Sequence, residues 1–166
     1  DFLTELAARH PDVNYVGLEM QQGVLYFAAR KAAERGLENL RLVVFDAARL
    51  TELFAPCEVD RIYLNFSDPW PKARHAKRRL TSPLFLARYR TVLKADGELC
   101  FKTDNMGLFD YSIETMASEA WQLSNVTHDL HALAEADNIM TEYERKFSAR
   151  GAKIGRLVAR PPEGWA

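Results

Sequence analysis

Short runs of apolar residues alternate with helix-like patterns from residue 2 to residue 120. Several runs are apolar on successive residues instead of on every second one, which is typical of parallel strands that are buried on both faces. The expected strands are residues 14–19, 42–45, 59–66 and 99–102. A parallel sheet of this kind is covered by helices. The alternation therefore predicts an α/β fold with three layers.

The segments between the strands have the apolar spacing of helices, which are expected to begin near residues 2, 20, 51, 85 and 109. Gly36 is expected to end the second helix and Asp96-Gly97 the fourth. On the second helix, one apolar face is expected to contain Val24, Phe27, Ala28 and Ala32.

The last part of the chain has a different pattern. Trp121–Thr127 and Lys153–Ala159 are expected to be two strands that face each other. The complete sheet is then mostly parallel, with an antiparallel C-terminal strand. No linker or repeat interrupts the 166 residues, so the sequence predicts one domain over residues 1–166.

Composition narrows the class of protein. Hydrophobic residues make up 48% and charged residues 27%, as in soluble globular proteins. No membrane-spanning run and no signal peptide is seen, so a cytoplasmic location without a membrane partner is expected. Cys57 and Cys100 lie near apolar stretches and are expected to be buried thiols. His128 and His131 lack the partners of a metal pair, so no metal is expected. Monomer and homodimer both stay open.

Four expected strands end at an acid. These acids are Glu19, Asp46, Asp68 and Asp104. Ligands of open α/β sheets bind outside the carboxyl ends of the strands, so these positions are candidates for a site. Each acid is equally well explained as a helix cap or a turn residue.

The acids at residues 19 and 46 suit a nucleotide. A carboxylate at Glu19 accepts hydrogen bonds from both ribose hydroxyls. Asp46 would accept from an exocyclic amine such as that of adenine. The alternative for Asp46 is a cap on the following helix.

Asp68 lies in a corner made rigid by proline, within NFSDPWPKARHAKRRL at residues 65–80. Pro69 and Pro71 restrict the backbone on either side of Trp70. The indole would stack on a base while Asp68 accepts from the base edge. The alternative is a turn with Trp70 buried in the core.

A basic run follows the corner without a gap. It contains Lys72, Arg74, His75, Lys77, Arg78 and Arg79. Such a run is often only a solvated face. Its position beside the candidate site favours binding of a nucleic-acid backbone, since lysine and arginine neutralise phosphates.

Residues 65–80 resemble the signature loop of bacterial tRNA (guanine-N7-)-methyltransferases. These enzymes transfer a methyl group from S-adenosylmethionine to a guanine in the tRNA variable loop. The blocks YVGLE, FDA, FKTDN and TEYERKF, at residues 15–19, 45–47, 101–105 and 141–147, match the family's blocks in order. The resemblance covers nearly the whole chain.

The resemblance implies a Rossmann-like methyltransferase sandwich with S-adenosylmethionine as cofactor and tRNA as partner. It implies that Glu19 binds the cofactor ribose, that Asp46 and Ala47 lie by the adenine, and that Asp68 is the catalytic acid and adjoins the cofactor. The implied substrate-binding residues are Lys72, Asp104, Thr141, Glu142, Tyr143 and Glu144. The implied contacts to the RNA backbone are Arg74, His75, Lys77, Arg78 and Arg79.

The residues near 141–147 also have a structural interpretation. Tyr143 and Phe147 are four apart, as on a helix that buries its aromatic side chains. On that helix Glu142 and Glu144 would face water.

The family's core begins with a strand and a glycine-rich loop, which this sequence lacks before Asp1-Phe2-Leu3. We therefore expect an N-terminally truncated domain with impaired cofactor binding. Two alternatives stay open: an RNA-binding fragment without activity, and a methyltransferase acting on another nucleic-acid base. A dehydrogenase would require the same glycine loop, and nothing resembles a nicotinamide site.

Overall fold

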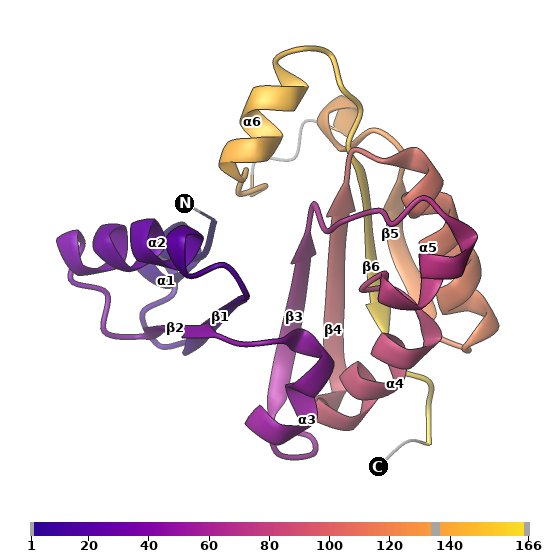
Figure 1. Ribbon diagram of the computed structural model, residues 1–166, viewed down its shortest axis with the longest axis horizontal. Coiled ribbons are helices and arrows are strands. Elements are labelled where there is room, and N and C mark those ends of the chain that lie inside the picture. Colours follow the sequence, from indigo (N-terminus) through magenta and orange to yellow (C-terminus); the bar gives the residue numbers. More distant parts are fainter. Residues whose placement is uncertain (1, 134–136, 165–166) are drawn as a thin grey trace. The chain divides into compact units, whose positions relative to one another are not determined.

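The computed structural model describes residues 2–133 and 137–164 (Figure 1). The chain forms two compact units, Asp1–Arg49 with Asp137–Arg145 and Leu50–Ala136 with Lys146–Ala166. We call them the first and second unit. The single domain expected from the sequence stays a prediction. Among the described residues, no helix is both long and apolar enough to cross a membrane.

The first unit contains a parallel pair of strands with helices α1 (Phe2–Arg9) and α2 (Gln22–Glu34). Strand β1 (Tyr15–Glu19) pairs in parallel with β2 (Leu40–Val44). A small core forms around Ala7, Ala32 and Leu40. Gly17 allows α1 to approach β1, because a Cβ there would lie 2.7 Å from Leu3 Cδ1 and 2.6 Å from Leu42 Cδ2. The expected strands at 14–19 and 42–45 are thus confirmed, the second beginning two residues earlier.

The buried face of helix α2 differs from the one expected. Leu25 and Ala32, seven residues apart and so on one face, are buried. Val24 and Phe27 are 53% and 59% exposed, so the apolar face expected to contain them is wrong. Gly36 follows the helix with φ +62°, a conformation that ends helices, as expected.

The second unit contains a four-stranded sheet in the order β3-β4-β6-β5. Strand β3 (Val59–Asn65) is parallel to β4 (Leu93–Thr103), and β6 (Gly155–Arg160) is antiparallel to both β4 and β5 (Gln122–Thr127). Strands β3, β4 and β5 therefore run in one direction, and only β6 among these four strands runs in the other. This confirms the mostly parallel arrangement with an antiparallel C-terminal strand.

Three short segments and two longer helices accompany this sheet. They are η2 (Ala73–Arg78), η3 (Leu130–Leu133), α3 (Leu50–Leu53), α4 (Pro83–Val92) and α5 (Met106–Ser118). Helices α4 and α5 lie on the same side of the sheet (Figure 1). Phe109 on α5 packs over Gly155, where a Cβ would lie 2.7 Å from the ring. This contact fixes α5 against β6.

Strand β4 is longer than the sequence indicated. Helix α4 ends at Val92, and the strand begins at the next residue. Asp96-Gly97 therefore lies inside the strand, where the β3–β4 register shifts between Val59 and Arg61. A Cβ at Gly97 would lie 3.1 Å from Asp60 O, so glycine permits this irregular pairing.

The two cysteines differ in environment. Cys100 on β4 is half-buried, and burial raises the pKa of its thiol to about 11. Cys57 is exposed in a turn with φ 55°, so the expectation that both thiols are buried is wrong for Cys57.

Glu98 connects three strands of the second unit. Its Oε2 lies 2.6 Å from Arg61 Nη2 on β3, and its Oε1 lies 2.8 Å from Arg160 Nη2 on β6. The hydrogen bond from Arg160, together with Arg61, lowers the pKa of the Glu98 carboxyl below its ordinary value. A carboxyl whose pKa is lower in the folded than in the unfolded state stabilises the fold at pH values above its unfolded-state pKa. This stabilisation is lost as the pH falls through the folded-state pKa.

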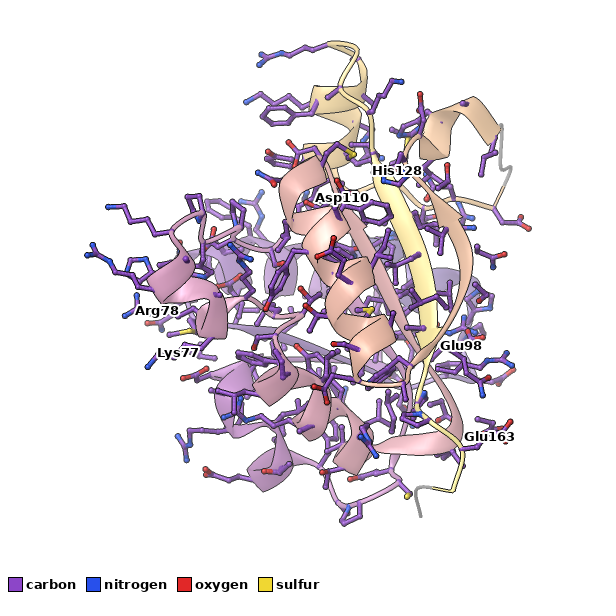
Figure 2. The ribbon with its side chains drawn as sticks, turned by 90° about the vertical axis from the view of Figure 1, so that its right-hand side faces the viewer. Lys77, Arg78, Glu98, Asp110, His128 and Glu163 are labelled. Carbon is purple, nitrogen blue, oxygen red and sulfur yellow. The ribbon has the colours of Figure 1, made fainter. Side chains whose placement is uncertain are left out.

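We expect Glu98→Gln to lower the free energy of unfolding by about 1–2 kcal/mol at pH 7, since the charged hydrogen bonds are lost but both arginines are partly exposed. The difference from wild type should shrink below pH ~4.5, where the unfolded-state carboxyl becomes protonated. Urea unfolding from pH 3 to 8 measures it. Glu163→Gln is the control, because Glu163 is exposed (Figure 2) and, among the residues that the structure describes, accepts a single bond, from Gln122 at 3.4 Å. Equal effects at both positions would contradict this account.

Candidate active site

Two of the expected site residues meet at one edge of the first unit. Glu19 ends β1 opposite Val44, and the Phe45 amide donates to the Glu19 carbonyl at 3.1 Å. Asp46 follows directly, so both acids lie at the carboxyl edge of the parallel pair, as predicted for ligand-binding residues.

The Glu19 carboxylate is held by its own turn. Oε1 accepts from the amides of Met20 at 2.8 Å and Gln21 at 3.0 Å. Both bonds use the same oxygen, so Oε2 keeps its acceptor capacity. One carboxylate oxygen is thus held by backbone amides, and the ribose contact predicted for Glu19 stays a prediction.

Asp46 is exposed and has a structural role. Its Oδ1 accepts from the Ala48 amide at 2.8 Å, which caps the short helix η1 (Ala47–Arg49). The cap that the sequence left as an alternative is therefore present. The predicted contact of Asp46 and Ala47 with adenine stays a prediction.

The block near residue 141 begins helix α6 (Glu142–Ser148). Thr141 Oγ1 accepts from the Glu144 amide at 2.9 Å, the threonine half of a capping box. Glu144 is completely buried, and its Oε1 accepts from Asn138 at 2.9 Å. Tyr143 is 41% exposed. The structural interpretation with Tyr143 buried and Glu144 in water is therefore wrong, because the cap turns Glu144 inward.

Glu142 faces outward on the same helix. Its carboxylate lies 2.6 Å from Lys31 Nζ on α2, and this bond lowers the pKa of the Glu142 carboxyl. The substrate role predicted for residues 141–144 stays a prediction.

The corner around Asp68 has an unusual backbone. Phe66 has φ 55° and Trp70 has φ 42°, both in the left-handed region. Side chains there cost of order 1–3 kcal/mol each, and such strain is concentrated at functional sites. The Phe66 amide donates to the Lys102 carbonyl at 2.9 Å, which ties the corner to β4. Asp68 is exposed, while Trp70 is half-buried and not fully enclosed by the core.

Side chains of the basic run surround Trp70. The Arg78 guanidinium lies 4.9 Å from the indole centroid, and the His75 ring meets the indole edge-on at 5.8 Å. Arg79 donates to the carbonyls of Pro69 and Trp70. Part of the run therefore stabilises the corner that precedes it.

The remaining basic side chains are directed to solvent. Lys72, Arg74 and Lys77 are exposed around η2. Figure 2 shows Lys77 and Arg78 on the outer side of η2, away from strands β4–β6. These exposed cations are the ones available to a phosphate backbone.

Asp104 follows the neighbouring strand in the same unit. Because β3 and β4 are parallel, with Asn65 opposite Lys102, Asp68 and Asp104 both follow carboxyl strand ends at one edge. Asn105 caps α5 by accepting from the Leu108 amide at 2.8 Å. The edge predicted for these two acids is therefore present in the second unit.

No group of three or more His, Cys, Asp or Glu side chains that could hold a metal occurs in residues 2–133 and 137–164. His128 instead lies 2.8 Å from Asp110 at the surface (Figure 2).

Comparison with known proteins identifies the class first. The family described as "Putative methyltransferase" matches residues 1–157. Among solved structures, an rRNA methylase from Streptococcus thermophilus has a TM-score of 0.59 at 12% identity, over 90% of this chain and 74% of its own. A geranyl diphosphate methyltransferase solved with SAM has a TM-score of 0.58 at 15% identity, over 93% of this chain and 71% of its own. These likenesses establish a methyltransferase fold.

Closer relatives identify the family. The tRNA (guanine-N(7)-)-methyltransferase of Macrococcus caseolyticus is 55% identical, over 96% of this chain and 76% of that protein. The protein of the same name from Brevibacillus brevis is 53% identical, over 95% of this chain and 74% of that protein. The chain belongs to the tRNA (guanine-N(7)-)-methyltransferase family.

Proposed function

We propose that this protein transfers a methyl group from S-adenosylmethionine to N7 of a guanine in the tRNA variable loop. The names of its relatives support the reaction. The observation that supports the position of the active site is the exposed Asp68 on a strained corner, which exposed cations follow directly in the sequence. We also propose a cytoplasmic location for the protein.

S-adenosylmethionine would supply an electrophilic methyl group on a sulfonium centre. The residues at the edge of the first unit fit its nucleoside part, since Glu19 Oε2 can accept from ribose hydroxyls while Oε1 is held by backbone amides. Asp46 and Ala47 would lie by the adenine.

Asp68 would orient the guanine and stabilise its developing charge. N7 carries a lone pair and no proton, so no general base is needed before the bond forms. The purine becomes positive during attack, and a carboxylate that accepts from N1–H and N2–H stabilises that charge. Asp104 is the better second acceptor, because Glu144 is fully buried beside Asn138.

The tRNA would be held by phosphate contacts. N7 lies on the major-groove edge, which is deep and narrow in A-form RNA, so the guanine must be exposed or unstacked. Unstacking costs a few kcal/mol, which contacts to the phosphates would offset. Exposed Lys72, Arg74 and Lys77 are suited to this role.

The test uses bulk tRNA that lacks the modification, with S-adenosylmethionine labelled in its methyl group. After incubation the tRNA is digested and the labelled nucleoside is identified. Label in 7-methylguanosine supports the proposal. Label in another nucleoside would reassign the target base, and tRNA binding without any label would favour the RNA-binding alternative.

A further inference from the structure

We infer that Arg79 is a positioning residue for Asp68 and not a contact to the RNA backbone. This inference rests on the proposed function, in which Asp68 faces the guanine. Arg79 closes the basic run, and its side chain turns back onto the corner that begins the run. The residue is half-buried, unlike Lys72, Arg74 and Lys77.

The guanidinium of Arg79 is bound to main-chain carbonyls. Nε donates to Pro69 O at 3.1 Å and to Trp70 O at 3.3 Å, and Nη2 donates to Trp70 O at 3.1 Å. Its central carbon lies 4.2 Å from the centroid of the Tyr111 ring. The planar fork of an arginine suits two adjacent carbonyls and an aromatic face, whereas a lysine ammonium does not reproduce this geometry.

These bonds lie where the corner needs support. Trp70 has φ 42°, an unfavourable conformation for a bulky residue. The prolines at 69 and 71 remove two amide donors from the corner, which leaves fewer local backbone bonds to hold it beside those from Arg79. Asp68 directly precedes Pro69, so the position of its carboxylate depends on this conformation.

Helix α5 holds the end of the basic run in place. Tyr111 lies on α5, and so does Ser112, whose Oγ is 2.7 Å from Thr81 Oγ1. Thr81 and Ser112 are both completely buried. Arg79 and Thr81, two residues apart, are thus both attached to the same helix, which fixes the end of the run relative to the sheet.

The test compares Arg79→Ala and Arg79→Lys with Lys77→Ala in methyl transfer and tRNA binding. Loss of the Arg79 bonds to the Pro69 and Trp70 carbonyls should lower kcat by roughly 10- to 100-fold, since misplacing a reacting group by about 1 Å has an effect of this size. The slope of log Kd against log salt should stay at the wild-type value for both Arg79 variants. Lys77→Ala supplies the pattern of a phosphate contact, with weaker binding and a smaller slope.

Amide hydrogen exchange gives a readout that does not require activity. We expect faster exchange at the Phe66 amide, whose bond to the Lys102 carbonyl ties the corner to β4, in both Arg79 variants and unchanged exchange in Lys77→Ala. This arm stays informative if guanine is not the methylated base. A smaller salt slope with normal kcat in Arg79→Ala would overturn the inference and make Arg79 a phosphate contact. Full recovery of kcat and exchange protection in Arg79→Lys would also overturn it, because charge alone would then suffice.

Discussion

Asp68→Asn is expected to lower the rate of methyl transfer by roughly 10²- to 10³-fold, the range for removing one preorganised group that stabilises transition-state charge. The substitution keeps the size of the side chain and removes its negative charge. An amide also replaces one acceptor with a donor, which would face the N–H groups of guanine. Affinity for tRNA should change little, since Asp68 is expected to make no phosphate contact.

Single-turnover rates at saturating tRNA and cofactor measure this effect without interference from product release. Asp110→Asn is the matched control, because Asp110 is an exposed acid of the same unit that pairs with His128 on the surface (Figure 2). Its rate should stay within about twofold of wild type, as for surface substitutions away from special features. Full methyl transfer by Asp68→Asn with unchanged tRNA affinity would show that our assignment of Asp68 is wrong.

The strands and their terminal acids were accessible to sequence reasoning because burial leaves a clear pattern. Consecutive apolar residues such as Leu42 and Val43 indicate a strand buried on both faces. Parallel pairing then brings the acids that follow such strands to one edge. The argument predicted all four acids along the edge of one sheet. The structure has two sheets and brings Glu19 with Asp46 to the edge of one and Asp68 with Asp104 to the edge of the other, so an edge common to all four stays a prediction.

The roles of individual cations were not accessible in the same way. Arg78 and Arg79 are adjacent and chemically identical, yet only Arg79 donates to the carbonyls of the corner. The difference depends on the left-handed Trp70 and on Tyr111, which is distant in sequence. No spacing rule relates these residues, because tertiary structure brings them together.

The sequence contains a pattern that indicates the burial of Glu144, but the spacing of the nearby aromatic residues favoured a different helix face. Thr141 and Glu144 have the separation of a capping box, which marks a helix start at Thr141. That start determines which side chains of α6 face inward. The spacing of Tyr143 and Phe147 fitted a helix equally well but predicted the wrong face.

Replacing Lys72, Arg74 and Lys77 together by alanine is expected to weaken tRNA binding by roughly 10- to 100-fold near 0.1 M salt, since each phosphate contact contributes through counterion release. The slope of log Kd against log salt should fall in magnitude by about two to three, because each lost contact removes about 0.7–0.9 from the slope. Fluorescence anisotropy with labelled tRNA from 50 to 300 mM salt measures both quantities.

A lower net charge alone would also weaken binding, so the control must remove the same charge elsewhere. Arg61, Arg88 and Lys94 lie in the same unit outside the basic run, and Arg61 and Lys94 are paired with Glu98 and Asp60. Their triple alanine variant has the same net charge as the first. If binding depends on phosphates aligned beside the Asp68 corner, the control should change the salt slope by less than about one. Equal losses in both triple variants would mean that tRNA responds to the overall field of the protein. The basic run would then be an ordinary solvated surface.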